Sequence, residues 1–305
     1  MHNVSGMFSC FRTFDTQPST MKNILIQLDT DPLPSTFDRV VAVDAGADEL
    51  FAYGGVTPDN VTPLVHGAMF TRGPDELKHT AIFIGGSDVA AGEALLAKVS
   101  ETFFGPMRVS VMMDSNGSNT TAAAAVQAAA RHMSLDGITA LVLGGTGPVG
   151  HRAAQILAMR GANVRVGSRS IDRAAETCDA IKRVVENAAV EPVASTGNGL
   201  AAATNDVKLL IAAGAAGVQF LAENEWQSID GLQVAIDLNA VPPVGLEGIG
   251  VADKAKEIAG VTCYGAIGVG GTKMKVHKAA IRRLFESNSD ILDTTAIASI
   301  AGEIG

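Results

Sequence analysis

The chain has 305 residues, 47% of them hydrophobic and 18% charged, and its 33 glycines are typical of a compact α/β protein of about two domains. Its formal net charge of −9 argues against a nucleic-acid partner, because no large basic surface could neutralise phosphates. Widely spaced cysteines and histidines predict neither a disulfide framework nor a metal site, and no apolar run is long enough for a membrane span, so we expect a cytoplasmic protein without a membrane partner.

Residues 1–20 lack both core periodicity and the basic-then-apolar pattern of a secretory signal. We interpret them as a disordered extension or the product of a misplaced translation start, because a clean strand begins directly after Met21.

The following segment alternates strands with helices, which predicts a largely parallel sheet. Strands are expected at 22–28, 50–53, 81–84 and 107–113. Helices are expected to begin near Ser35 or Thr36, at Thr57, after Asp88 and in the Ala-rich run that ends near His132. Residues 134–137 then link this first domain to the next.

Residues 138–170 show strand, glycine turn, helix and second strand, the pattern that opens a dinucleotide-binding fold. Gly145 permits a tight turn, Gly147 allows backbone amides to approach a pyrophosphate, and Gly150 allows the helix to pack closely on the strand. The alternative is a purely structural turn. We predict that the turn binds a dinucleotide through Gly145, Thr146, Gly147, Pro148, Val149 and Gly150.

The end of the second strand predicts which dinucleotide binds. NAD-specific folds place Asp or Glu there to bond the ribose hydroxyls, whereas this strand runs into Gly167-Ser168-Arg169-Ser170. A guanidinium suits a 2′-phosphate, because it offers paired donors and a permanent charge. We therefore expect NADP, bound by Ser168, Arg169 and Arg173; the alternative is that Arg169 points to solvent and selectivity is relaxed.

Two later loops are expected at the sheet edge where parallel α/β folds bind ligands. Strands at 207–211 and 233–236 lead into the loops 212–217 and 237–243. These loops should bring Ala213, Gly214 and Asn239 beside the nicotinamide ribose and ring. The alternative for each is a tight connection without ligand contact.

The glycine-rich segment 265–273 is expected to be a hinge or cofactor lip that includes Gly268. A helix over 274–286 would return to the first domain. His277 shares the face of that helix with Met274, Ile281 and Leu284, which favours a packed core histidine over a catalytic one.

Ten stretches, in order across both halves, resemble one family: QLDTDPLPSTFD, DAGAD, YGGVTPDNV, FTRG, FIGGSD, FFGP, DSNGSNTTAAA, GGTGPVG, DLNAVPPVG and GAIGVGGTKMKVHKA. They are similar to the bacterial NADP-dependent methylene-tetrahydromethanopterin dehydrogenases, some of which also act on methylene-tetrahydrofolate. The resemblance covers about residues 22–305. It implies a two-domain α/β fold with its active site in the interdomain cleft, homo-oligomerisation, and a role in oxidising formaldehyde-level one-carbon units.

On this basis we expect an oxidoreductase. The substrate (pterin) domain would comprise 21–133 plus 273–305, and a Rossmann-type doubly wound NADP domain 134–272. The substrate carbon lies between two nitrogens whose lone pairs stabilise the cation left by hydride loss, so the reaction needs positioning more than an acid–base pair. No convincing Ser/His/Asp, Cys/His or metal constellation is present, which agrees with such chemistry.

A carboxylate can accept both donors on one edge of a pterin ring. Asp38 and Asp114 match family stretches, while Asp29 and Asp31 are further candidates, and each of the four could instead cap a helix. Ser115, Asn116, Ser118 and Thr120 could donate neutral hydrogen bonds to the pterin, or the start of the helix could consume them. By resemblance, Lys273 is the candidate catalytic lysine; otherwise it is a surface residue.

Two alternatives to the leading function stay open. One is the same reaction on methylene-tetrahydrofolate, because the two carriers share the reacting ring. The other is a dinucleotide-binding sensor without catalysis. The Tyr-x-x-x-Lys pair of the related bifunctional folate enzymes is missing, since Thr57 and Gly268 stand four residues after Tyr53 and Tyr264, so cyclohydrolase activity is not expected.

Overall fold

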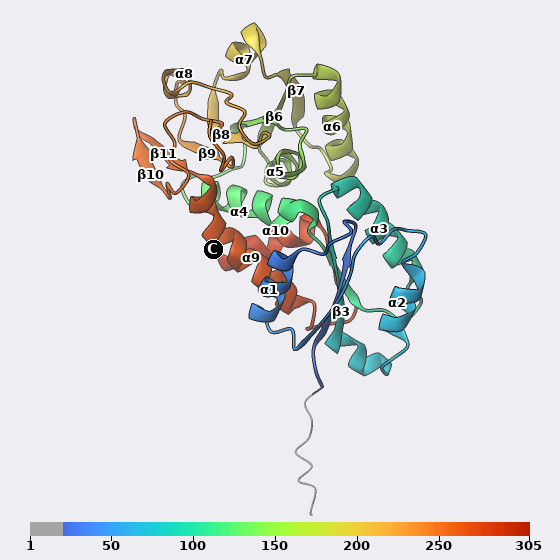
Figure 1. Ribbon diagram of the computed structural model, residues 1–305. Coiled ribbons are helices and arrows are strands. Elements are labelled where there is room, and N and C mark those ends of the chain that lie inside the picture. The colour runs from blue at the N-terminus through green and yellow to red at the C-terminus, as the bar shows by residue number, and fades with distance from the viewer. Residues whose placement is uncertain (1–20) are drawn as a thin grey trace, which may run out of the picture.

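The computed structural model describes residues 21–305, so the predictions for residues 1–20 lie outside the described residues. Two sheets divide the molecule, each with helices on its faces (Figure 1). This is the predicted α/β class. Among residues 21–305, no helix is both long and apolar enough to cross a membrane.

The first sheet is parallel throughout, with strand order β12-β4-β3-β1-β2. Its strands are β1 (Ile24–Asp29), β2 (Glu49–Tyr53), β3 (Thr80–Gly85), β4 (Ser110–Met113) and β12 (Ile291–Leu292). The helices of this half are α1 (Thr36–Asp44), α2 (Thr62–Met69), α3 (Val89–Thr102) and α4 (Ser118–Ala130), with short 3₁₀ turns at η1 (Pro74–His79) and η2 (Ser115–Gly117). Because β12 pairs with β4, the C-terminal segment returns to the first half.

The second sheet has seven strands in the order β10-β11-β9-β8-β5-β6-β7. All neighbours are parallel except β10 and β11. The strands are β5 (Thr139–Leu143), β6 (Asn163–Ser168), β7 (Val190–Ala194), β8 (Val207–Ala212), β9 (Val234–Asp237), β10 (Lys256–Ile258) and β11 (Val261–Tyr264). Its helices are α5 (Pro148–Met159), α6 (Ile171–Val184), α7 (Gly197–Ala203) and α8 (Glu223–Gln227).

Local side chains explain several helix starts. Ser35 caps α1 by accepting from the amide of Asp38, and Asp88 caps α3 by accepting from the amide of Ala91. The helix expected from Thr57 begins instead at Thr62, because the Asn60 side chain accepts from the Thr57 amide at 2.8 Å and holds a turn there.

The glycine-rich hinge expected at 265–273 was a wrong prediction. Helix α9 (Ala266–Arg283) includes most of that segment and crosses the predicted domain boundary at 272/273 without a break. Glycine serves close packing here: a Cβ on Gly268 would lie only 1.8 Å from the carbonyl oxygen of Asp253. The domain boundaries therefore stay a prediction.

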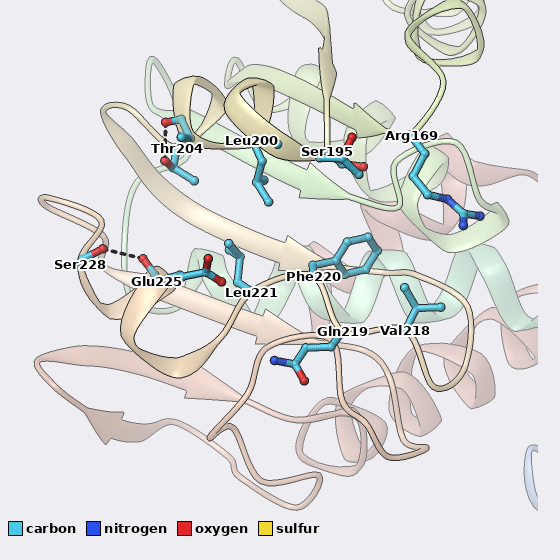
Figure 2. Close-up of a pocket in the computed structure, with 13 residues that line it drawn as sticks. Arg169, Ser195, Leu200, Thr204, Val218, Gln219, Phe220, Leu221, Glu225 and Ser228 are labelled. Atoms are coloured by element: carbon cyan, nitrogen blue, oxygen red, sulfur yellow. Dashed lines mark hydrogen bonds between the residues drawn. The ribbon is translucent and has the colours of Figure 1, made fainter.

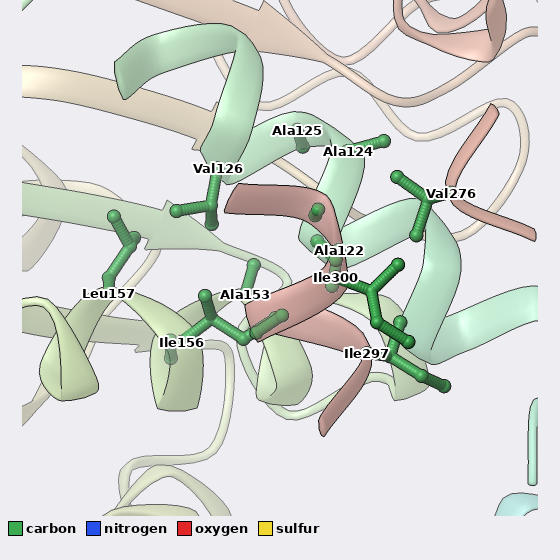
Figure 3. Packing of buried hydrophobic residues seen from close by; sticks show 14 of the residues in the cluster. Ala122, Ala124, Ala125, Val126, Ala153, Ile156, Leu157, Val276, Ile297 and Ile300 are labelled. Atoms are coloured by element: carbon green, nitrogen blue, oxygen red, sulfur yellow. The ribbon is translucent and has the colours of Figure 1, made fainter. Parts of the chain in front are cut away.

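One hydrophobic core runs through both halves. Helix α4 packs against α5 of the second half and against α9 and α10 (Thr294–Ile304), so four helices share one interior. Small side chains on α4, including Ala122, Ala124 and Ala125, lie in one cluster with Ala153 and Ile156 of α5 and Val276 of α9 (Figure 3). Alanine lets these helices approach closely, which joins the two sheets into one packed body.

Candidate active site

The glycine turn between β5 and α5 has the geometry of a phosphate cradle. Gly144 has φ +71°, and a Cβ there would lie 2.8 Å from the carbonyl oxygen of Ala213. A Cβ on Gly150 would lie 2.3 Å from the carbonyl oxygen of Gly144. The first intrahelical bond of α5 is donated by the His151 amide to Gly147, while the Gly147 amide donates to Gly144. The amides of Val149 and Gly150 therefore remain free to face an anion.

A cavity of about 470 Å³ opens above this turn. Most of the predicted cofactor residues line it, namely Thr146, Gly147, Ser168, Arg169, Arg173, Ala213 and Gly214. Its lining contains two arginines and three serines but no carboxylate. Neither guanidinium makes an ion pair within the described part of the chain, so both charges are available to an anionic ligand.

An adjoining cavity of about 560 Å³ extends away from Arg169. Figure 2 shows Arg169 at one end, with Leu200 and Phe220 along the walls and Glu225 and Ser228 at the far end. Apolar walls with polar groups at the ends suit a planar base, and the shared Arg169 joins this space to the phosphate side.

Six predicted cofactor residues do not line this cavity: Gly145, Pro148, Val149, Gly150, Asn239 and Gly268. Gly145 packs against β6, where a Cβ would meet Val166, and Gly150 holds the helix on the turn. The Asn239 side chain donates to the carbonyls of Ala215 and Pro243 and accepts from the Val241 amide. It therefore ties two loops together. Gly268 packs inside α9, away from the cavity.

The first half has its own cavity, of about 420 Å³, at the carboxyl ends of β1 and β3. Its lining includes Asp31, Leu33, Phe37, Asp38, Ser87, Asn116, Gly117 and Lys273. Asp31 accepts two hydrogen bonds from Ser87, and Asp29 accepts from Gln27, Asp31 and Ser35. These two carboxylates therefore hold the loop. Asp38 is half-buried on the cavity wall, and burial raises the pKa of its carboxyl against the opposing effects of Ser35 and Lys273.

Lys273 reaches this cavity from α9. Its Nζ lies 4.5 Å from the centroid of the Phe37 ring, a cation–π distance, and it approaches the Asn116-Gly117 turn, where Asn116 has φ +55°. The lysine side chain is half-buried. One turn further along α9, His277 is fully buried and stacks on Phe83 at 5.7 Å, as a packed core histidine should.

The polar residues of the β4–α4 connection divide into two groups. Ser115, Ser118 and Thr120 are fully buried and donate to Gly85, to Ser115 and to Asp114. These internal hydrogen bonds occupy all three hydroxyl groups, and our expectation that they face the pterin is not met. Only Asn116 of the predicted set lines the cavity.

Asp114 lies beneath this wall. It is 1% exposed and accepts from both the hydroxyl and the amide of Thr120. Burial raises the pKa of Asp114 to about 7, against the opposing hydrogen bonds from Thr120 and the charge of Lys273.

A fourth cavity, of about 500 Å³, lies between the two halves. It shares Ser87 with the first-half cavity, and Thr146 and Gly147 with the nucleotide cavity. The N-terminal ends of α3 and α5 border it from the two halves. The lysine-lined cavity and the cavity above the glycine turn therefore both adjoin this one.

Comparison with known proteins identifies the family. A family model for "Methylene-tetrahydromethanopterin dehydrogenase, N-terminal" matches residues 36–116. A Methylorubrum extorquens protein named "NAD(P)-dependent methylenetetrahydromethanopterin dehydrogenase" is 32% identical over 282 residues, which covers 88% of this chain and 94% of the relative. The chain belongs to the methylene-tetrahydromethanopterin dehydrogenase family.

A second relative from the same organism, "Bifunctional protein MdtA", is 45% identical over 286 residues, or 93% of this chain and 99% of the relative. Among solved structures, quinate dehydrogenase from Corynebacterium glutamicum in complex with NAD gives a TM-score of 0.51 at 13% identity, covering 92% of this chain and 99% of that one. That likeness supports the fold alone.

Several lining residues of this family member were missed by sequence reasoning. Ser195 follows β7, a strand too short and irregular in pattern to predict, and Phe220 packs on Gly214 from a loop without periodicity. Phe37 and Leu33 lie in the QLDTDPLPSTFD stretch, where two large apolar residues in a proline-containing loop and helix start were the available signal, and both are exposed in the structure. Within the described residues, no group of three or more His, Cys, Asp or Glu side chains forms a metal site.

Proposed function

We propose that this protein is an oxidoreductase of one-carbon metabolism that moves hydride from the methylene carbon of methylene-tetrahydromethanopterin to NADP, leaving the methenyl cation. The observation that carries the proposal is that the Lys273 cavity and the cavity above the glycine turn both adjoin a cavity between them, in a member of this family. The nicotinamide ring, when bound, supplies the hydride acceptor.

The protein's own groups then act by binding and orientation. Asp38 is the carboxylate best placed to accept from the pterin edge, because Asp29 and Asp31 already bond the loop and Asp114 is bonded to Thr120. Lys273 and Phe37 offer a charge and an aromatic face to the ring system. Because loss of hydride releases no proton, no general base is required, and positioning with exclusion of water provides the catalysis.

The nucleotide cavity supports NADP over NAD. Its lining lacks the carboxylate that would bond a ribose 2′-hydroxyl and would repel a 2′-phosphate, while Arg169 and Arg173 provide cationic donors. Ser168 and Ser195 add hydroxyl groups at the same end of the cavity. The glycine turn suits the pyrophosphate of either dinucleotide, so selectivity depends on the arginines.

We also infer that the chain assembles with copies of itself. Helix α1 exposes Val40 and Val43, and the neighbouring edge strand β2 exposes Phe51 and Tyr53, so an apolar surface is available beside an unpaired strand edge. The mass of the protein in solution is the measurement that checks this inference.

The deciding experiment follows NADPH absorbance with purified protein and each methylene carrier in turn. We expect NADPH to form with methylene-tetrahydromethanopterin. Methylene-tetrahydrofolate is included because it presents the same reacting ring and because the more similar relative is named a bifunctional protein. Turnover with folate alone would reassign the substrate, and NADP binding without any turnover would favour a sensor.

A further inference from the structure

Within the described residues, one ion pair links helix α3 of the first half to helix α5 of the second, beside the cavity of about 500 Å³ between them. Arg152, on the second turn of α5, donates through Nη2 to Glu93 of α3. Both residues line the cavity that shares Ser87 with the lysine-lined cavity and Gly147 with the glycine turn. The pair therefore borders the space between the two proposed ligands.

Away from this cavity the two halves are joined mainly by apolar packing, with a hydrogen bond between His132 and Tyr264. The shared core of α4, α5, α9 and α10 lies on one side of the junction, whereas α3 and α5 make few close backbone approaches. Among residues 21–305, the other ion pairs connect groups within one half or within the α1–α9 contact. Where α3 faces α5, the distance between the two halves therefore depends mainly on the contact between Arg152 and Glu93.

The two side chains of the ion pair differ in exposure. The arginine side chain is 8% exposed and that of Glu93 52%, so the guanidinium charge is largely removed from water and depends on its partner. The buried Nε of Arg152 has no hydrogen-bond partner. Neighbouring His151 adds no competing charge at neutral pH, because burial and the charge of Arg152 lower its pKa to about 4.

We propose that Arg152 and Glu93 are positioning residues, whose ion pair sets the distance between the substrate-binding and nucleotide-binding halves and so the distance over which hydride moves. This inference rests on the proposed function. Hydride transfer between two bound ligands is steeply sensitive to their separation, and a misplacement of about 1 Å can cost about a hundredfold in rate. A contact at the junction is thus positioned to control the chemical step without touching either ligand.

The test is a double-mutant cycle of Arg152→Met and Glu93→Gln in the full chain, read by turnover and by the primary deuterium isotope effect with methylene-deuterated carrier. We expect each substitution to lower turnover by roughly tenfold and to raise the isotope effect, with the substrate KM nearly unchanged. The double variant should be no slower than Arg152→Met, because either substitution alone already removes the same ion pair. Glu49→Gln, which breaks the exposed pair with Lys22 inside one half, should change nothing.

A second readout does not depend on activity. Spin labels on Glu101→Cys of α3 and Val184→Cys of α6, both exposed, with Cys10 replaced by serine, report the distance between the halves. Arg152→Met should broaden that distance distribution. If no carrier is turned over, the proposed function fails while a broadened distribution still supports the positioning contact. Two results would overturn the inference. One is an active Arg152→Met variant with an unchanged isotope effect. The other is an unchanged distance distribution in Arg152→Met, whether or not the enzyme turns over.

Discussion

Arg169 lines both the cavity above the glycine turn and the adjoining cavity that is walled by Leu200 and Phe220. A charge-assisted contact to a 2′-phosphate is worth about 1.5–3 kcal/mol, or about tenfold to a hundredfold in preference. Arg169→Ala should therefore lower kcat/KM for NADP by that factor and change the value for NAD far less. Arg183→Ala, at the other end of α6, is the matched control. An equal loss with both cofactors would place Arg169 in the fold or at the pyrophosphate.

Lys273 faces the other cavity and does not line the nucleotide cavity. Replacing it with alanine should lower turnover by roughly tenfold or more while leaving NADP affinity nearly intact, because a pterin-side charge acts on substrate orientation. Steady-state kinetics and NADP titration separate the two effects. Lys275→Ala, two residues along the same helix and exposed, should behave as wild type. Weaker NADP binding with normal saturated turnover would move Lys273 to the cofactor side.

Asp114 gives the protein a pH-dependent stability. Its pKa is raised by burial from 3.8 to about 7, so between those pH values the folded protein binds more protons than the unfolded chain. The free energy of unfolding should consequently fall as pH rises from about 4 to about 7 and level off above. Asp114→Asn, which keeps an acceptor for the Thr120 amide, should flatten that slope in denaturant titrations. A slope identical to that of the wild type would mean that another group carries the linkage.

These residues also show how much of the candidate site could be predicted from the sequence. The pattern after β6 led to Arg169, and the family resemblance led to Asp38 and Lys273, and all three line cavities. The same reasoning also selected Ser115, Ser118 and Thr120, which are buried and bonded at the start of α4. A short polar side chain beside a helix start can cap the backbone or face a ligand, and only the surrounding geometry decides between them.

Glycines in two helices should respond oppositely to the same substitution. Gly150→Ala places a Cβ against the backbone oxygen of Gly144, so α5 must shift away from the turn, at a cost of about 1–3 kcal/mol and with weaker cofactor binding. Gly271→Ala in α9 meets nothing within 4 Å and should stabilise by about 0.5–1 kcal/mol through helix propensity. Thermal unfolding of the two variants measures both signs. Destabilisation by Gly271→Ala would show that the glycine there has another role.

The two glycine-containing segments also show which helices and strands could be predicted from the sequence. Residues 138–170 combine an apolar run, a glycine turn and an amphipathic helix, and β5, α5 and β6 follow that pattern. At 265–273 a high glycine content indicated a hinge, but those glycines lie in α9, where Gly268 lets the helix pack against residues 253–254. The shortest elements, such as β12 and α8, carry too few residues to show periodicity.

Two α/β halves were predictable because strands and helices alternate twice along the chain. Their junction was not, since an Ala-rich run has little amphipathic pattern and does not reveal that α4 is covered from both sides. The predicted return of the C-terminal segment to the first half agrees with the pairing of β12 with β4, although α9 belongs to neither half alone.

The buried faces of α4 also determine how the molecule responds to heat. Melting either half would expose alanines that pack against the other, so calorimetry should record one cooperative transition for the whole chain. NADP at one hundred times its Kd should add about 2.7 kcal/mol to the free energy of unfolding and shift that single transition upward. Two transitions, only one of them moved by NADP, would contradict the shared interior. A ligand held at the glycine turn thereby protects the distant strands of the first sheet from thermal denaturation.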